Sequence, residues 1–135
     1  MGVMKKLSDR QLFERTITED DVLGAIRSIL ELNCARVHRI VERIPWGRKT
    51  SEKGIPDLFG WWPEHRKPNV PDGFVEGLPI HFFIEVKRPG GKLRPAQSAW
   101  IALARADGVI AFKAESVEEM VLEFKKYGIE IKGLK

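Results

Sequence analysis

Cysteine is nearly absent from this sequence of 135 residues, which contains only Cys34. A single cysteine excludes an internal disulfide and a zinc site built from several cysteines. It fits a reducing compartment, so we expect a cytoplasmic protein of a bacterium or a phage-infected cell. Long apolar stretches are also missing, because no window approaches the roughly 18 apolar residues of a membrane-spanning helix. The charged N-terminus lacks the apolar stretch of a signal peptide, and we therefore expect neither a membrane span nor secretion.

A large excess of charge of either sign is missing too. The chain has 23 Lys and Arg against 19 Asp and Glu, which gives a formal net charge of +4 at pH 7. Such an excess suits a polyanionic partner, but many basic proteins bind none. Apolar residues make up 43% and charged residues 31% of the chain, which predicts a globular rather than a disordered protein. The length is that of about one domain, and we expect a polar lead-in at 1–17 and a single domain at 18–135.

The hydrophobic periodicity predicts helices and strands that alternate along the chain. Apolar residues recur at helical spacing in 19–33, after a potential capping box formed by Thr18 and Asp21. Further helices are predicted at 95–106 and after Ser116, and strands at 35–44, 55–62, 80–87 and 109–112, with a short edge strand at 129–131. The strand, helix and strand between 80 and 112 predict a right-handed crossover with parallel pairing. The predicted fold class is therefore α/β, with a central mixed sheet flanked by helices.

The most distinctive chemistry lies on the strand predicted at 80–87. Glu85 and Lys87 are two residues apart, so both side chains leave the same face of the strand. Asp57 begins the preceding strand, and neighbouring strands lie about 4.8 Å apart, so two carboxylates and an ammonium group can converge. Mg²⁺ takes oxygen ligands, commonly one or two carboxylates with phosphate and water, and the backbone carbonyl of Val86 can supply another oxygen. We therefore predict a site for Mg²⁺ or Mn²⁺, with Lys87 orienting the attacking water.

An alternative interpretation of this pattern is purely structural. A Glu-x-Lys pair on an alternating strand is more often part of a solvated face with a weak ion pair. Phe83 shares that face, however, so the face is not simply exposed to solvent. A Pro-Asp at the head of one strand with Glu-x-Lys in the next is also a more demanding combination than either part, which favours the metal site.

Three short segments carry a family resemblance: Gly54-Ile55-Pro56-Asp57-Leu58, Ile84-Glu85-Val86-Lys87-Arg88-Pro89, and Gly91-Lys92-Leu93-Arg94-Pro95-Ala96-Gln97 with Trp100. In this order, and over roughly residues 18–120, the chain resembles the virus-type replication-repair nuclease (VRR-NUC) domain of the PD-(D/E)xK nuclease superfamily. The resemblance implies a restriction-endonuclease-like core and a metal-dependent phosphodiesterase. It also implies that Asp57 and Glu85 are metal ligands, that Lys87 is the catalytic lysine, and that Gln97 lies near the site.

The resemblance further implies an acidic residue in the first helix, and Glu19 matches it best. Glu19 shares a helical stripe with Val22, so it can face the sheet rather than water, and the resemblance implies that it serves as a further catalytic residue and metal ligand. Asp20 and Asp21 are alternatives, and acidic residues are common in a first helical turn because the helix dipole favours them there. The proline-rich loop at 63–79 is longer than the motif needs, which leaves the substrate preference open.

Basic residues gather around these segments and are candidates for DNA contacts. They are Arg48, Lys49, Lys53, Arg66, Lys67, Arg88, Lys92 and Arg94. As a group they predict a rim that binds phosphates with an affinity that falls as salt rises, although each alone is typical of a solvated loop. Trp46, Trp61 and Trp62 can stack on unpaired bases, but packing in a core or an interface is the more common role of each, as it is of Trp100.

These features predict a metal-dependent endonuclease that hydrolyses DNA phosphodiester bonds, with a role in DNA repair. Stand-alone members of the family resemble archaeal junction resolvases, which implies cleavage of four-way (Holliday) junctions or other branched DNA. A symmetric junction needs two cuts and one small domain offers one site, so we expect a homodimer. Two alternatives remain: a sequence-specific restriction-type nuclease with the same core, and a non-catalytic nucleic-acid-binding module. A carboxylate pair repels phosphate in the absence of a metal, which argues against the second alternative.

Overall fold

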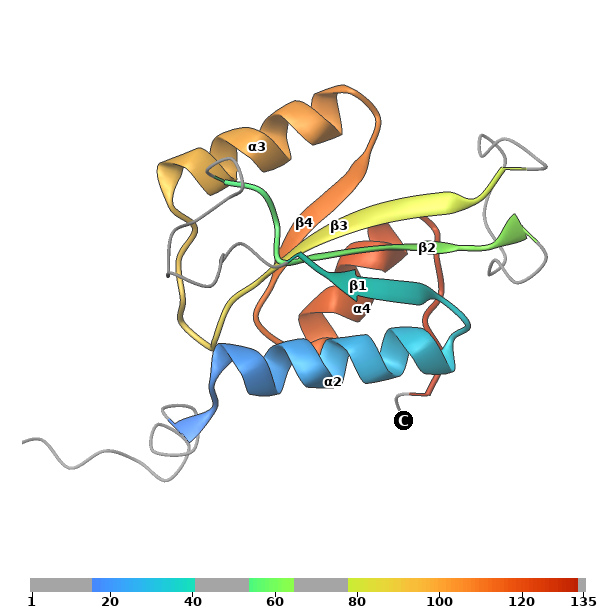
Figure 1. Ribbon diagram of the computed structural model, residues 1–135, viewed down its shortest axis with the longest axis horizontal. Coiled ribbons are helices and arrows are strands. Elements are labelled where there is room, and N and C mark those ends of the chain that lie inside the picture. Colours follow the sequence, from blue (N-terminus) through green and yellow to red (C-terminus); the bar gives the residue numbers. More distant parts are fainter. Residues whose placement is uncertain (1–15, 41–53, 65–77, 134–135) are drawn as a thin grey trace, which may run out of the picture.

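A computed structural model of the chain describes residues 16–40, 54–64 and 78–133 (Figure 1). The elements follow in the order α2 (Glu19–Leu32), β1 (Arg36–Arg39), β2 (Leu58–Trp62), β3 (Ile80–Val86), α3 (Pro95–Ala106), β4 (Ile110–Ala114) and α4 (Val117–Lys126). This order confirms the predicted α/β alternation. Within the described segments, every helix is too short or too polar to cross a membrane.

The strands form one mixed sheet in the order β1-β2-β3-β4. β1 pairs antiparallel with β2, and β2 pairs antiparallel with β3, whereas β3 and β4 are parallel. α3 connects the parallel pair, which confirms the predicted strand–helix–strand unit. Figure 1 shows α3 towards the top of the view, beside β4, and α2 and α4 towards the bottom.

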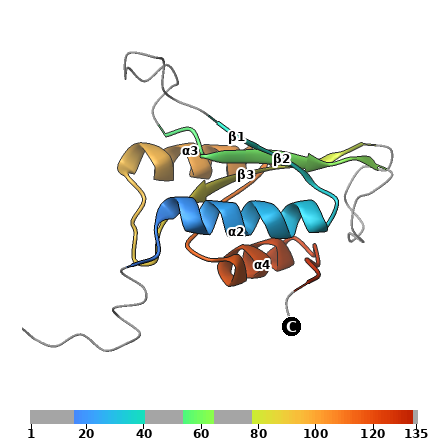
Figure 2. The same cartoon turned by 60° about the horizontal axis from the view of Figure 1, so that its bottom comes forward.

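Alternation along β3 separates two packed faces of the sheet. Phe82, Ile84 and Val86 belong to the main core, which α2 and α4 cover. Phe83 lies on the opposite face, where a smaller cluster includes Ile101 of α3. Figure 2 shows α2 and α4 next to each other on one side of the sheet, in agreement with their direct contact. The two helices therefore bury one face, and α3 covers part of the other.

The helix ends follow the predicted capping signals. The Thr18 hydroxyl accepts a hydrogen bond from the Asp21 N–H at 3.1 Å, and the Asp21 carboxylate accepts one from the Thr18 N–H at 3.0 Å. Hydrogen bonds from the backbone and side chain of Thr18 lower the pKa of Asp21. At the other end of the chain, Ser116 caps α4 by accepting from the Glu119 N–H at 3.0 Å. Gly108, with φ of +83°, follows α3 in the left-handed conformation that glycine tolerates.

Two strand predictions need correction. Residues 129–131 form no strand, because Ile129 and Ile131 are buried in the main core and the segment is tied to the end of α2 instead. The Asn33 side chain makes that tie, since it donates to the Lys132 carbonyl and accepts from the Lys132 N–H, both at 2.7 Å. β1 ends at Arg39 rather than at 44, and residues 41–44 lie outside the described segments.

Candidate active site

The start of β2 and the end of β3 bring Asp57 and Glu85 together. Leu58 pairs with Ile84, so the antiparallel register places Asp57 opposite Glu85. The Asp57 carboxylate accepts a hydrogen bond from the Val86 N–H at 3.0 Å, and the Asp57 carbonyl accepts one from the Ile40 N–H at 2.7 Å. The predicted meeting of these two carboxylates at one end of the sheet therefore agrees with the structure.

Glu85 is buried, with a side chain only 3% exposed, and its two oxygens differ in their surroundings. Oε1 accepts a hydrogen bond from Gln97 Nε2 at 2.8 Å and lies 3.4 Å from Lys87 Nζ. Oε2 is buried as well but has no hydrogen-bond donor among the described residues. An unsatisfied buried carboxylate oxygen is costly, so this atom needs either a proton or a cation.

The raised pKa of Glu85 also indicates that its carboxylate needs a proton or a cation. Burial, followed by the charge of Asp57, raises the pKa of Glu85 to about 8; a hydrogen bond to Asp57 adds to the rise, and Lys87 opposes it. Such a bond requires a shared proton, because two ionised carboxylates are both acceptors. With its pKa raised to about 8, Glu85 favours the protonated form near neutral pH when no metal is bound, and a divalent cation can replace that proton.

Lys87 lies just beyond β3, where the strand turns towards α3. Its side chain is 9% exposed, and its N–H donates to the Ala114 carbonyl at 3.0 Å, so pairing with β4 holds it in line with the strand. The chain then turns back, with the Gly91 N–H donating to the Arg88 carbonyl at 2.8 Å and Gly90 at φ of +81°. A Cβ on Gly91 would lie 3.1 Å from the Lys87 Cβ, so the turn is packed closely against the lysine.

Gln97 reaches the site from the first turn of α3. Its amide oxygen accepts a hydrogen bond from the Arg94 N–H at 2.8 Å, which satisfies one free donor at the helix start. That bond fixes the amide so that Nε2 points to Glu85. The expected position of Gln97 near the site thus agrees with the structure, and a surface amide in a first helical turn does not describe it.

Gly54 fits the segment before Asp57 against the same turn of α3. Its φ is +91°, and an added Cβ would lie 2.4 Å from the Ala96 carbonyl oxygen. Pro56, the next residue but one, is fully buried. The Gly54-Ile55-Pro56 segment therefore packs directly on the helix that carries Gln97, which couples the positions of Asp57 and Gln97. The sequence offered no signal for this contact beyond the glycine itself.

The donor set fits Mg²⁺ in number and chemistry. The described residues contain no group of three or more His, Cys, Asp or Glu side chains able to hold a metal. The site therefore has two carboxylates, those of Asp57 and Glu85. One or two carboxylates are what proteins usually contribute to a Mg²⁺ site that phosphate and water complete. Oε2 of Glu85, which is buried and has no donor among the described residues, can supply one of the oxygen ligands.

The acidic residues of the first helical turn are not drawn into this pair. Asp21 serves the capping box, and Asp20 lies 3.2 Å from Arg39 in an ion pair. Glu19 is exposed, so the expectation that it faces the sheet rather than water is wrong: burial along α2 begins only at Val22. Figures 1 and 2 both place the beginning of α2 beside the loop between β3 and α3, which keeps Glu19 at the same end of the sheet as the carboxylate pair.

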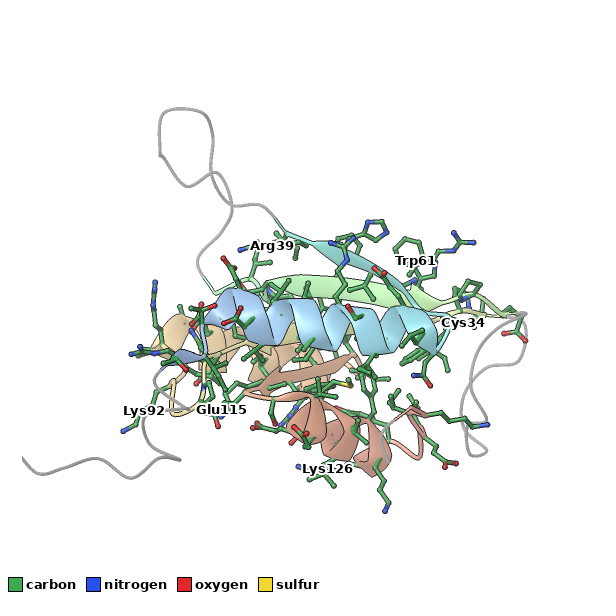
Figure 3. All side chains as sticks on the ribbon, turned by 90° about the horizontal axis from the view of Figure 1, so that it is seen from below. Cys34, Arg39, Trp61, Lys92, Glu115 and Lys126 are labelled. Carbon is green, nitrogen blue, oxygen red and sulfur yellow. The ribbon has the colours of Figure 1, made fainter. Side chains whose placement is uncertain are left out.

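Three of the basic candidates lie on the loop that leaves the site. Arg88, Lys92 and Arg94 are all exposed between β3 and α3. Figure 3 shows Lys92 extending outward at the end of the molecule where α2 begins. The other basic candidates lie outside the described segments; they are Arg48, Lys49, Lys53, Arg66 and Lys67. Trp46 lies outside them as well.

The remaining tryptophans divide between packing and exposure. Trp100 packs edge-on against Phe83, with ring centroids 5.1 Å apart. Trp62 is fully buried, and its indole N–H donates to the Asn33 carbonyl at 2.9 Å. Both therefore have the packing role that is commoner for tryptophan. Trp61 is partly exposed on the face that carries Phe83. The sequence did not predict that Trp61 is partly exposed while its neighbour Trp62 is buried.

A sequence model for one protein family, the VRR-NUC domain, matches residues 3–118. The chain belongs to the VRR-NUC family. The match begins ahead of residue 18, which is where the motif resemblance begins, and it spans the Asp57, Glu85, Lys87 and Gln97 segments. The mixed sheet with its three flanking helices is consistent with a restriction-endonuclease-like VRR-NUC fold. The chain is thus a nuclease-type domain with DNA as its implied substrate, in a superfamily that generally uses divalent metals. No curated protein matches the sequence.

Proposed function

We propose that this protein is a Mg²⁺-dependent endonuclease that hydrolyses DNA phosphodiester bonds, and that Mn²⁺ can replace Mg²⁺. The observation that carries the proposal is the buried Oε2 of Glu85, which has no hydrogen-bond donor among the described residues and belongs to a carboxyl group whose pKa the charge of Asp57 helps to raise. In the proposed site Asp57 and Glu85 hold the metal, and the backbone carbonyl of Val86 supplies a further oxygen. When bound, the metal would polarise the scissile phosphate and lower the pKa of a water molecule.

The protein's own groups prepare the site for that chemistry. Gln97 holds Oε1 of Glu85 at 2.8 Å, so the carboxylate is oriented before a ligand arrives. Lys87 places a positive charge 3.4 Å from the same oxygen, and burial strengthens its field. We propose that Lys87 orients the attacking water and offsets the negative charge that develops on the phosphate.

Glu19 remains a candidate for a secondary contribution at the metal. It is exposed at the beginning of α2, beside the loop between β3 and α3 (Figure 1). Asp20 is a matched control, because it is the next residue and is already paired with Arg39. A Glu19→Gln variant that cleaves more slowly than an Asp20→Asn variant supports Glu19, and equal rates remove it from the site.

For the substrate we propose branched DNA, cut by a homodimer. The support is physical, since a symmetric four-way junction needs two cuts and each chain supplies one carboxylate pair. Arg88, Lys92 and Arg94 provide exposed positive charge on the loop adjoining that pair, as phosphate contacts require. The proposed DNA-binding set also includes Arg48, Lys49 and Lys53.

The test is a cleavage assay on labelled single-stranded, duplex, flap and four-way-junction DNA, with and without Mg²⁺. We expect Mg²⁺-dependent cutting of branched substrates that Glu85→Ala and Lys87→Ala abolish. Leu122→Ala is the matched control, because Leu122 is 60% exposed on α4, away from the site. Discrete bands on linear plasmid, indifferent to branching, would favour a sequence-specific nuclease. Undiminished cutting by the folded Glu85 and Lys87 variants would contradict the site.

A further inference from the structure

A row of aromatic side chains extends from the carboxylate pair across the sheet. Phe59 and Trp61 of β2, and Asp57 just before it, are two residues apart and leave the same face. Phe59 pairs with Phe83, and Trp61 pairs with His81, on the side of β3 that also carries Glu85. The aromatic row therefore begins one alternation step from the proposed metal site and leads away from it.

The rings lie close to one another and nearly parallel. The His38 ring lies 5.2 Å from that of Phe59 and 5.1 Å from that of Trp61, with interplanar angles of 24° and 18°. The centroid of the Phe59 ring lies 6.1 Å from that of the Trp61 ring and 6.3 Å from that of the Phe83 ring. We call the set formed by His38, Phe59 and Trp61 the aromatic platform. Its members come from the two strands that α3 leaves uncovered.

The aromatic platform remains accessible within the described fold. α2 and α4 pack on the opposite face, and the contacts of α3 with the sheet centre on β4. His38 is exposed, and Phe59 and Trp61 are partly exposed. Figure 3 shows Trp61 projecting on the side of the sheet away from α2 and α4.

The charge around the aromatic platform suits a polyanion. Arg36 is exposed and pairs with Trp61 across β1 and β2, so a guanidinium group borders the outermost ring. Exposed His81 borders the same ring from the other strand. Glu85, in the proposed metal site, is the only acidic residue within β1, β2 and β3. An apolar protein partner would not need the guanidinium group, whereas phosphates beside stacked bases would.

We propose that the aromatic platform binds single-stranded DNA, with unpaired bases stacking on Phe59, Trp61 and His38 and with Arg36 contacting a phosphate. Stacking of bases on aromatic side chains does not depend on the DNA sequence, because every base has a π face. The inference extends the proposed function, since it supplies a path for the unpaired strand of a branched substrate into the carboxylate pair. It predicts a preference for substrates in which a single strand adjoins a duplex.

Binding without cleavage separates this inference from the proposed function. We would measure the fluorescence anisotropy of a labelled oligothymidylate about 10 to 15 nucleotides long, and of a duplex, with full-length protein in EDTA. Trp61→Leu should weaken single-strand binding about 5- to 100-fold and duplex binding much less. Trp61→Phe, which keeps an aromatic ring, should restore affinity but lose part of the tryptophan quenching by DNA. Arg36→Gln should reduce the salt dependence by about one phosphate contact, and Leu122→Ala should change neither property.

Three outcomes would overturn the inference. One is unchanged single-strand affinity in Trp61→Leu. Another is an equal loss for single strand and duplex, which would indicate a general effect on the fold. The third is conversion of a dimer to a monomer in Trp61→Leu, seen by sedimentation, with unchanged single-strand affinity per chain, since this would assign the face to a second copy. Loss of cleavage in Glu85→Gln with normal oligothymidylate binding leaves the inference intact.

Discussion

The two faces of β3 differ in what they leave unsatisfied. On one face Phe82, Ile84 and Val86 are buried among apolar side chains of α2 and α4, with no polar group to satisfy. On the other, Glu85 is equally inaccessible but has an oxygen without a donor and a pKa raised to about 8. The side chains on one face of β3 therefore stabilise the domain, whereas the other face contains Glu85, whose burial costs folding free energy. Phe83 on the same face packs against Trp100, so the unsatisfied oxygen is confined to the end of the strand beside Asp57, where we propose that a metal binds.

Substitutions at neighbouring residues of β3 should separate the two faces most strongly. Glu85→Gln should lower cleavage at least about 100-fold while it raises metal-free stability, because the amide needs no cation and can donate to Asp57. Ile84→Ala should do the reverse, with a loss of about 2–5 kcal/mol in the free energy of unfolding and a near-normal rate for the folded fraction. Urea unfolding and cleavage rates measure both. A Glu85→Gln protein that is less stable than wild type in EDTA would contradict the comparison.

Gln97 tests whether the orientation of the carboxylate matters separately from its charge. Gln97→Leu removes the donor to Oε1 of Glu85 and leaves both carboxylates in place, so we expect a loss of about 10- to 100-fold in metal affinity or activity. Ser98→Ala is the control on the next, exposed position of α3. Metal titrations of the cleavage rate would show the effect, and equal curves for the two variants would remove Gln97 from the site.

Gly54 tests the packing that joins the Asp57 segment to α3. Gly54→Ala forces a Cβ to 2.4 Å from the Ala96 carbonyl oxygen, whereas Gly90→Ala has an equally unfavourable φ of +81° but no atom within 4 Å. Both variants should lose about 1–3 kcal/mol from backbone strain. Only Gly54→Ala should also lose activity in its folded fraction, because Asp57 and Gln97 move apart. Similar activities would show that this contact does not position the site.

The pH dependence of stability should give the smallest effect. The folded-state pKa of Glu85 is raised from 4.5 to about 8, so the folded protein holds a proton that the unfolded chain releases. Its contribution to metal-free stability is full below about pH 4.5 and is lost as pH rises through about 8. Wild type should therefore lose stability relative to Glu85→Gln across that window in EDTA, and saturating Mg²⁺ should reduce the loss. Thermal unfolding at several pH values measures it, and parallel curves in EDTA would contradict the raised pKa.

The sequence predicted the elements that depend on local signals. The Thr18–Asp21 capping box, the proline at the start of α3 and the alternation of β3 each act through neighbouring residues, and the structure agrees with all three. The apolar alternation at 129–131 led to a wrong strand prediction, because a non-strand segment that buries two alternate residues in the core has the same pattern as a strand. The exposure of Glu19 was missed for a related reason, since a helical stripe does not reveal where the sheet ends.

Some features of the site could likewise be predicted from neighbouring residues, whereas others depend on contacts between segments far apart in the sequence. The spacing of Glu85 and Lys87 and the order of the motif segments predicted which groups meet. The donorless oxygen, the packing of Gly54 on α3 and the row formed by His38, Phe59 and Trp61 depend on the register of three strands. Trp61 and Trp62 are adjacent and of identical chemistry, and only the sheet decides that one is core and the other surface.

The most direct test of the central claim is Mg²⁺ binding by isothermal titration calorimetry near neutral pH, in buffers of different ionisation enthalpy. If Asp57 and Glu85 hold the metal in place of a proton, wild-type protein should bind Mg²⁺ and release about one proton per ion, and Glu85→Gln should bind far more weakly with no release. Mg²⁺ binding without proton release, or undiminished binding by Glu85→Gln, would contradict the account.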